Sequence, residues 1–580
     1  MTGDTTVEHS HTTLLVRAVI GLAQGLALFA LTHAAEVRSW PATDPILYAP
    51  LVTVCIFAPI VAIVGLGNLR PRTLALWTAT AIAICAGLAV YDIFRDVRDP
   101  GTDTRYLPGP VFWLGLAAGL FIAHSLIVAG NAERKYLASY ATDFDVSWKL
   151  AVRGALAGAF VGAFWLLLWL GAELFRLIRI EILADLIQHD WFWLPATTFV
   201  FACALHITDG RAGIVEGARM LALALLSWLL PVMTLLALAF VLALPFTGLE
   251  PLWSTRRATA ILLVASAALV VLINAAYQDG RYDAPAALRY ASRAAALVLV
   301  PIAALAAYGL SLRVTQYGWT PERVTACACV VIAGCYAIGY AATALHWRGR
   351  LRGIEATNIA TALATLATLL ALFTPVADPA RTAVADQMRR LQDGRIAAEK
   401  FDYDFLRFRS GRFGLAALAQ LAAEQPAGYA AQRAKLLLNA KTIAEARRAG
   451  PQSRATNITL LHPAGQVLPE RFLAQDWSRL PRRWQFPPCL LDNGKCEAVL
   501  MDIDGDGTPE ILLFGLPTGV AAAFKAGADG TWALVGTIAD AQCSGVREAL
   551  RSGPVMSAEP RFREIEVGRH RLRIIAPCAE

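Results

Sequence analysis

The sequence predicts a polytopic α-helical membrane protein with about eleven transmembrane helices, followed by a C-terminal soluble α+β domain. Up to residue 377 long apolar runs recur, and charged residues are confined to short clusters between them. The rest of the chain has ordinary soluble composition. Over all 580 residues 56% are hydrophobic and 17% charged, whereas soluble proteins carry about a quarter charged residues. The mean hydropathy is +0.49.

A helix that crosses the hydrocarbon core needs roughly 20 apolar residues, and a helix satisfies its own backbone hydrogen bonds in lipid. Eleven segments fit, at about residues 13–35, 47–67, 73–94, 108–130, 152–175, 191–208, 220–247, 257–277, 293–313, 323–346 and 354–375. The first has a long apolar run preceded by polar residues, so we interpret it as an uncleaved span rather than a signal peptide.

Eleven spans place the two chain ends on opposite sides of the membrane. With a cytoplasmic N-terminus, the cytoplasmic segments hold 15 Lys and Arg residues and the opposite segments 10. The positive-inside rule favours this orientation. We therefore expect a multi-pass protein of the bacterial inner membrane whose C-terminal domain lies in the periplasm.

Composition divides the chain into a transmembrane domain and a soluble part, and the soluble part has two regions. Residues 1–377 are the predicted transmembrane domain, residues 378–450 have helix-forming composition and form a helical neck, and residues 451–580 are a small β-rich domain. Within the last region the strand-like segments are CEAVLMDI, EILLFGL, WALVGTI and HRLRIIA.

Cysteine usage agrees with a periplasmic location. Six of the ten cysteines lie in or beside spans, and the soluble part holds Cys489, Cys496, Cys543 and Cys578. An even set in a soluble domain is what two disulfides in an oxidising compartment require. Among three possible pairings we expect Cys489–Cys496 with Cys543–Cys578. The alternative is four buried free thiols.

One motif points to metal chemistry. In MDIDGDGTPE three carboxylates alternate along a tight, glycine-containing loop, which gives the oxygen-rich arrangement that Ca²⁺ prefers. The candidate ligands are Asp502, Asp504, Asp506, Thr508 (through its carbonyl) and Glu510. The loop resembles the DxDGDG calcium loops of FG-GAP-type repeats, at this single site. A polar β-turn without metal is the alternative.

Polar residues within the spans bear on transport, because charges inside a membrane are costly and often functional. His124 and His206 fit packing roles or proton relays, Asn274 and Asn358 could bridge helices, and Glu173 lies near an interface. Convergence of His124, His206, Asn274 and Glu173 on one cavity would favour a transporter. Scattered contacts would favour a scaffold.

Other functional classes find little support in the sequence. Lys and Arg sit at span ends, without a basic patch with interleaved aromatics, so no nucleic-acid partner is expected. Searches for G-x-x-x-x-G-K-[ST], G-x-S-x-G, H-E-x-x-H and a Rossmann fingerprint find nothing. We therefore expect no catalytic residues, although these motifs do not cover every enzyme.

Three stretches resemble the DUF4153 family of bacterial membrane proteins: residues 165–205, 310–340 and 401–418. The most specific is the turn QYGWTPER at 316–323, where Thr320 is a suitable N-cap with Pro321 at the first helical position. The resemblance covers about residues 10–440. It implies a bacterial inner-membrane protein of undefined activity and supplies no catalytic residues.

These observations lead to two main functional hypotheses, and a third, a membrane enzyme acting on lipid-linked envelope material, ranks last because no acid/base or nucleophile set is visible. The first is a non-enzymatic cell-envelope protein that presents a periplasmic interaction or sensing module to envelope protein partners. The alternative is a transporter or channel for a small solute or lipid. Both require the lipid bilayer as the solvent of the first two thirds of the chain.

Overall fold

The computed structural model describes residues 2–96, 107–255, 257–282, 284–346, 353–424, 428–440, 442, 457–463, 465–475, 477, 485–491, 494–516, 520–527, 530–543, 545–559, 565–567 and 570–572. The chain forms two compact units, Met1–Glu424 and Gln425–Glu580.

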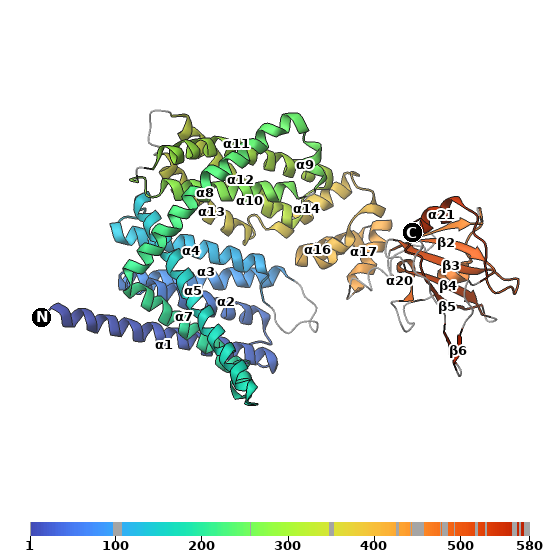
Figure 1. Cartoon of the computed structure of the whole chain (residues 1–580), viewed down its shortest axis with the longest axis horizontal. Coiled ribbons are helices and arrows are strands. Elements are labelled where there is room, and N and C mark those ends of the chain that lie inside the picture. Colours follow the sequence, from blue (N-terminus) through green and yellow to red (C-terminus); the bar gives the residue numbers. More distant parts are fainter. Residues whose placement is uncertain are drawn as a thin grey trace. The chain divides into compact units, whose positions relative to one another are not determined.

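The first unit is a bundle of long apolar helices (Figure 1). Eleven helices of the described part are long and apolar enough to cross a membrane: α1 (Thr2–Glu36), α2 (Pro45–Gly65), α3 (Pro71–Arg95), α4 (Pro110–Glu133), α5 (Tyr140–Leu177), α7 (Asp190–Gly210), α8 (Ala212–Thr247), α10 (Ala258–Tyr277), α11 (Ala286–Tyr317), α12 (Pro321–Leu345) and α13 (Gly353–Leu372). Short helices α6 (Ile182–Leu186) and α9 (Glu250–Ser254) stand between spans. The predicted polytopic fold is confirmed.

Four helices extend well beyond the apolar runs that predict them, and one of them is α1, which begins at Thr2 rather than near residue 13. α5 begins at Tyr140 rather than near residue 152, because its first turns continue as a polar helix supported by the ion pair of Asp145 with Lys149 (2.7 Å). α8 and α11 likewise start several residues early. Hydropathy locates the part of a helix that lies in hydrocarbon, and it does not register a helical extension into water.

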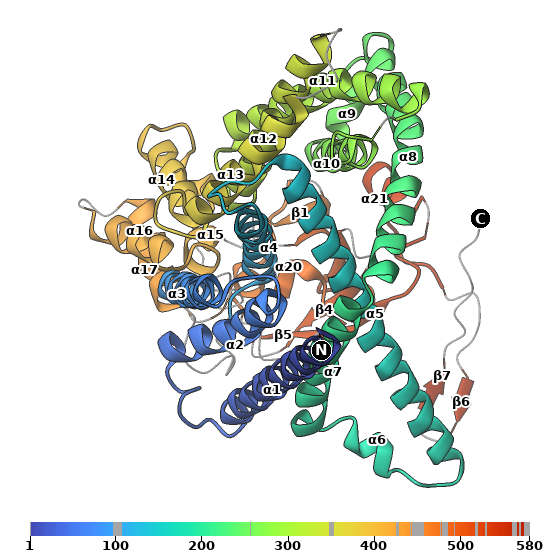
Figure 2. The ribbon, with the colours of Figure 1, turned by 90° about the vertical axis from the view of Figure 1, so that its left-hand side faces the viewer.

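The spans pack as two groups. α1 to α7 form one group, with α1 against α7 and α2 against α3, and α8 with α10 to α13 form the other. α13 packs on α4 and α5, and α8 packs on α5, which joins the groups. Figures 1 and 2 show the second group, green to yellow, beside the first.

Several buried hydroxyl groups inside the spans bond to their own helix. Thr53, Thr234 and Ser266, all buried, each donate to the carbonyl four residues earlier, at 2.7, 2.7 and 2.8 Å. A hydroxyl bonded to its own helix adds no unsatisfied group to the apolar interior.

We call the side on which α1 begins the N-terminal face and the side on which α13 ends the C-terminal face. On the N-terminal face, buried Arg17 contacts Asp209 (2.5 Å), which also contacts Arg153 (2.9 Å). This network ties α1, α5 and α7 together at one end. Because an uncompensated buried charge is expensive, the three helices must meet at this point.

On the C-terminal face the chain continues into α14 (Pro379–Gln392), η1 (Ala398–Lys400), α15 (Tyr403–Phe408) and α16 (Gly411–Ala423). α14 packs on α12, and α16 packs on α14 and α3. Most of the predicted neck therefore belongs to the same compact unit as the spans. The remaining described helix of the neck, α17 (Tyr429–Asn439), belongs to the second unit.

The second unit is built on a five-stranded sheet. Its strands are β1 (Ile458–His462), β2 (Lys495–Met501), β3 (Glu510–Leu516), β4 (Ala521–Ala526) and β5 (Trp532–Ile538), in that spatial order. β1 is parallel to β2, and the other pairs are antiparallel. The elements outside this sheet are α19 (Glu470–Ala474), α20 (Pro488–Leu491), α21 (Val546–Ser552) and the pair β6 (Ile565–Val567) and β7 (His570–Leu572).

Apolar side chains cover both faces of the sheet. An aromatic cluster of Phe472, Trp477, Phe486, Phe524 and Trp532 packs with residues of β2 and β3, and Leu550 of α21 packs with Val499 and Leu512. The predicted Cys489–Cys496 disulfide is confirmed and joins α20 to β2. The other predicted pair, Cys543 with Cys578, includes a residue outside the described part of the chain.

Candidate metal centre

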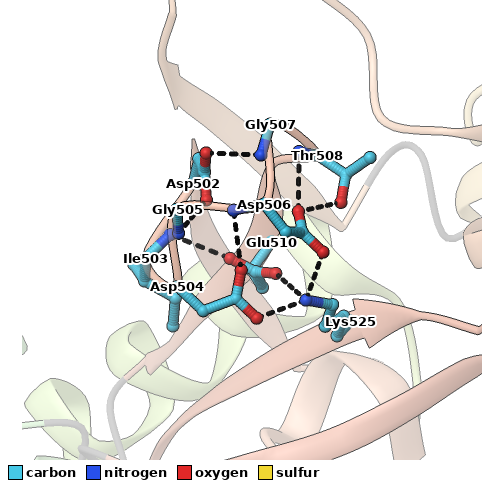
Figure 3. Close-up of polar contacts among 9 residues, drawn as sticks. All are labelled: Asp502, Ile503, Asp504, Gly505, Asp506, Gly507, Thr508, Glu510 and Lys525. Atoms are coloured by element: carbon cyan, nitrogen blue, oxygen red, sulfur yellow. Dashed lines mark hydrogen bonds and ion pairs between the residues drawn. The ribbon is translucent and has the colours of Figure 1, made fainter.

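The acidic loop connects β2 to β3, and its backbone is folded by its own carboxylates (Figure 3). Asp502 accepts from the N–H groups of Gly505 (2.7 Å) and Gly507 (2.9 Å). Both glycines have positive φ, +78° and +85°, which explains why this loop needs residues without a Cβ. The loop is therefore a defined turn rather than an open chain of acidic residues.

Three of the five predicted ligands come together. Asp502, Asp504 and Glu510 each place one carboxylate oxygen within 4.8 Å of the others. Glu510 is 1% exposed, and its Oε2 accepts from the Ile503 N–H (2.9 Å). Its Oε1 is buried and makes no hydrogen bond within the described structure. A buried carboxylate oxygen without a hydrogen bond, beside two other carboxylates, suits a cation.

The other two predicted ligands face each other instead. Asp506 Oδ1 accepts from the backbone N–H of Thr508 (2.8 Å) and from its hydroxyl. Asp506 Oδ2 contacts the ammonium of Lys525 (2.5 Å).

Lys525 is the residue that sequence reasoning missed. Its Nζ contacts Asp504 Oδ2 and Asp506 Oδ2, and lies 3.5 Å from Glu510 Oε1 (Figure 3). Lys525 is on β4, which runs antiparallel to β3, and Phe524 of β4 pairs with Ile511 of β3. Glu510 precedes Ile511 and Lys525 follows Phe524, so these two residues lie at the same end of the strand pair. The ammonium thus contacts two of the three carboxylates that lie close enough to hold a metal ion, those of Asp504 and Glu510.

The ion pairs shift both partners away from their ordinary titration ranges. Hydrogen bonds from Lys525 and Thr508 lower the pKa of Asp506, and those to Asp504 and Asp506 raise the pKa of Lys525. The Asp506 contribution to stability is present above its unfolded pKa and lost as pH falls, and the Lys525 contribution is lost only in alkali. The pair stays ionised from roughly pH 4 to pH 10.

The polar residues of the spans occupy separate places in the first unit. His124 Nδ1 accepts from the Trp77 indole (3.0 Å) between α3 and α4, and Glu173 pairs with Arg176 (2.7 Å) at the end of α5. His206 lies half-buried on α7. These residues do not gather around one cavity.

Asn274 and Asn358 do bridge helices, as the sequence suggested. Tyr140 donates to Asn274 Oδ1 (3.1 Å), and Asn274 Nδ2 donates to Tyr340 (2.8 Å). Tyr340 in turn donates to Asn358 Oδ1 (2.5 Å), and Asn358 Nδ2 donates back to Asn274 (2.5 Å). The network links α5, α10, α12 and α13, and Tyr340 is fully buried.

Comparison with known proteins gives one match. The model of the family described as Domain of unknown function (DUF4153) matches residues 22–423. No curated protein and no solved structure matches the chain. The matched region ends at residue 423, one residue before the end of the first compact unit at Glu424, so the sheet unit with its acidic loop lies outside it. The match extends over more than half of the chain, which therefore belongs to the DUF4153 family.

Proposed function

We propose that this protein is a non-enzymatic protein of the bacterial inner membrane that carries the Gln425–Glu580 unit in the periplasm as an interaction or sensing module. The observation that carries the proposal is the disulfide between Cys489 and Cys496 within a separately packed unit. Stable disulfides are a feature of oxidising compartments. The excess of Lys and Arg at the opposite span ends supports the same orientation.

The module responds to Ca²⁺ in this proposal. Asp502, Asp504 and Glu510 supply the ligand oxygens, and Lys525 is the internal cation that Ca²⁺ displaces. Three carboxylates, those of Asp504, Asp506 and Glu510, contact one ammonium, so the loop retains excess negative charge when Lys525 is in place. Displacement of the Lys525 ammonium by Ca²⁺ would free Asp506 from its ion pair and change the contact between β4 and the loop. This structural change is the sensing event.

The alternative function, transport of a small solute, has weaker support. It calls for polar side chains along a common path. His124, Glu173 and Asn274 instead have partners at three separate places.

Reporter fusions test the orientation. Alkaline phosphatase fused after Glu580 should be active and green fluorescent protein at the same site dark. Fusions in the segment between α4 and α5, after Lys135, serve as the control and should give the opposite pair of signals. Fluorescence with inactive phosphatase after Glu580 would place the module in the cytosol and end the proposal.

Calorimetry of the Gln425–Glu580 unit tests the cation response. Ca²⁺ should bind with a measurable heat that Asp504→Asn abolishes. Glu548→Gln, which removes a carboxylate from α21 outside the loop, is the matched control and should titrate like the unmodified unit. Identical heats for Asp504→Asn and Glu548→Gln would rule out the loop as the site.

A further inference from the structure

The connection between α5 and α7 carries large apolar side chains that the protein leaves uncovered. α5 ends at Leu177, and the chain then passes through α6 to Asp190, the first residue of α7. Figure 2 shows α6 in this connection, at the ends of α5 and α7. We call residues 174–193 the α5–α7 connection. Its exposed apolar side chains include Leu174, Phe175, Leu177, Ile178, Ile180 and Ile182.

Two polar contacts fix α5 and α7 at matching heights. At the N-terminal face Arg153 of α5 contacts Asp209 of α7 (2.9 Å). Twelve residues further along α5, the Trp165 indole donates to the hydroxyl of Thr197 (3.1 Å). Thr197 lies twelve residues before Asp209, so equal lengths of the two antiparallel helices separate the two contacts.

The same spacing places the α5–α7 connection at the edge of the hydrocarbon core. Glu173 lies twenty residues beyond Arg153, a rise of about 30 Å along a helix, which matches the thickness of that core. Asp190 lies nineteen residues before Asp209, so α7 begins at nearly the same height. Glu173 pairs with Arg176 (2.7 Å). Because charged groups are costly inside the bilayer, Glu173, Arg176 and Asp190 mark where the two helices reach the membrane surface.

α6 folds back onto α5. The Leu183 side chain of α6 lies against Gly171 of α5, where a Cβ would come within 3.3 Å of it. At the end of α5 the N–H groups of Ile178 and Ile180 both donate to the Phe175 carbonyl, at 3.1 and 3.0 Å. The turn after α5 therefore pairs backbone groups within itself, as a segment that lies against lipid requires.

The exposed side chains of the α5–α7 connection continue the lipid-facing surface of α5. Leu167 and Leu170 are exposed within the span, and Leu177 (81%) and Ile182 (77%) are exposed beyond its end. The connection also includes two exposed tryptophans in the first turn of α7, and tryptophan is enriched at membrane–water interfaces. An exposed apolar patch of this kind marks an interaction site, and the interface that adjoins it is the bilayer.

The charged residues of this segment do not favour an anionic surface. Residues 173–190 contain two arginines and four acidic residues, Glu173, Glu181, Asp185 and Asp190. An interfacial segment binds through buried apolar area and through electrostatic attraction to anionic lipids. Because the net charge here is negative, the apolar area is the part of this attraction that the connection can use.

We propose that the α5–α7 connection is an interfacial lipid-binding surface, whose apolar side chains insert into the leaflet on the C-terminal face of the protein's own membrane. Lipid already covers the adjoining side of α5, so the same solvent reaches the connection without a further partner. This surface belongs to the membrane unit, is separate from the proposed C-terminal module, and does not depend on which compartment the C-terminal face meets.

Site-specific photocrosslinking of the full-length protein in phosphatidylcholine nanodiscs tests this surface. The photoreactive amino acid p-benzoylphenylalanine replaces Leu177 or Ile182, one at a time, and intact mass spectrometry after illumination measures lipid adducts. Leu167, 68% exposed within the span, is the positive control, and Val467, 86% exposed in the second unit, is the negative control. The yield of lipid adducts at Leu177 and Ile182 should match that at Leu167 within about threefold and exceed that at Val467 at least about tenfold.

The lipid composition gives a second comparison. Because apolar side chains carry the binding, nanodiscs with added phosphatidylglycerol should give the same adduct yield as nanodiscs of phosphatidylcholine alone. A requirement for phosphatidylglycerol would mean that charge, rather than apolar area, holds the lipid, and it would contradict the proposal.

Three further results would overturn the proposal. Lipid adducts at Leu167 but at neither Leu177 nor Ile182 would place the connection in water. A crosslink between two chains would identify a second copy as the partner. A crosslink to a different protein in intact cells, in place of lipid, would identify a protein-binding surface. Because both replaced side chains are exposed, their replacement leaves the packing of the helices unchanged.

Discussion

The carboxylate of Asp386 accepts a hydrogen bond from the backbone N–H of Trp319, at 2.8 Å across 67 residues of sequence. Trp319 belongs to the turn between α11 and α12, and Asp386 to α14. Gln387 adds bonds to the carbonyls of Tyr317 (3.0 Å) and Trp319 (3.1 Å). Side chains of α14 thus hydrogen-bond to backbone groups of the turn between α11 and α12. These bonds hold α14, the first helix after the spans, against that turn.

Gly318 should be essential for this attachment. Its φ is +77°, and a Cβ there would lie 2.6 Å from Gln387 Nε2 and 2.7 Å from Asp386 Oδ2. Gly318→Ala should therefore strain the backbone and also push α14 away, for a combined destabilisation of about 2 kcal/mol. Trypsin cleavage at Arg389 and Arg390 in the full-length protein, followed over time, would measure the release of α14.

Gly394→Ala is the matched control for this prediction. Gly394 also has a positive φ, +69°, but nothing lies within 4 Å of its Cβ position. It should share the backbone strain without the collision. If both variants are cleaved at the same rate, the collision with α14 has no effect.

Lys525→Met should increase the Ca²⁺ affinity of the acidic loop. The ammonium repels an incoming cation and occupies oxygens of Asp504 and Asp506. Its removal should tighten binding roughly tenfold, as expected for one charge at contact distance in a solvated site. Titration calorimetry gives the change, with Lys495→Met on β2 as the control. A variant with no Ca²⁺ heat would identify the loop as a β-turn stabilised by Lys525 alone.

The spans and the acidic loop could be read from the sequence, but Lys525 could not. The strand that carries it, Ala521–Ala526, has the sequence AAAFKA, whose alanines have low β-propensity. Only pairing with β3 and β5 makes it a strand. A usable signal was the short segment between EILLFGL and WALVGTI, which leaves room for one more antiparallel strand.

The packing of α14 on the turn between α11 and α12 could not be predicted from the sequence either. Its sequence has an amphipathic pattern typical of a soluble helix. What fixes it is Asp386, Gln387 and Arg390 reaching backbone groups about 70 residues away. Bonds from side chains to remote backbone leave no periodic pattern, whereas hydropathy reports each span independently of its neighbours.

Reduction of the Cys489–Cys496 disulfide should destabilise the sheet unit by about 2–3 kcal/mol, the chain-entropy expectation for a bond that closes a short loop. Urea unfolding of the Gln425–Glu580 unit, with and without reductant, measures the difference. A Cys489→Ala, Cys496→Ala double variant should lose this part of the reductant effect and keep only the part due to the disulfide of Cys543. Reductant that leaves the midpoint of the unmodified unit unchanged would contradict a structural role for this bond.

Tyr340→Phe should loosen the membrane unit by removing the centre of its interhelical network. The Tyr340 hydroxyl accepts from Asn274 and donates to Asn358, whereas Asn274 Nδ2 also bonds the Val270 carbonyl (2.8 Å). The substitution therefore leaves Asn358 Oδ1 without its donor, for a loss of about 1 kcal/mol. Thermal unfolding of the full-length protein in detergent is the measurement, with Tyr336→Phe, one turn earlier on α12, as the control. Equal midpoints for the two variants would mean that packing of the ring, rather than its hydroxyl, holds α10, α12 and α13 together.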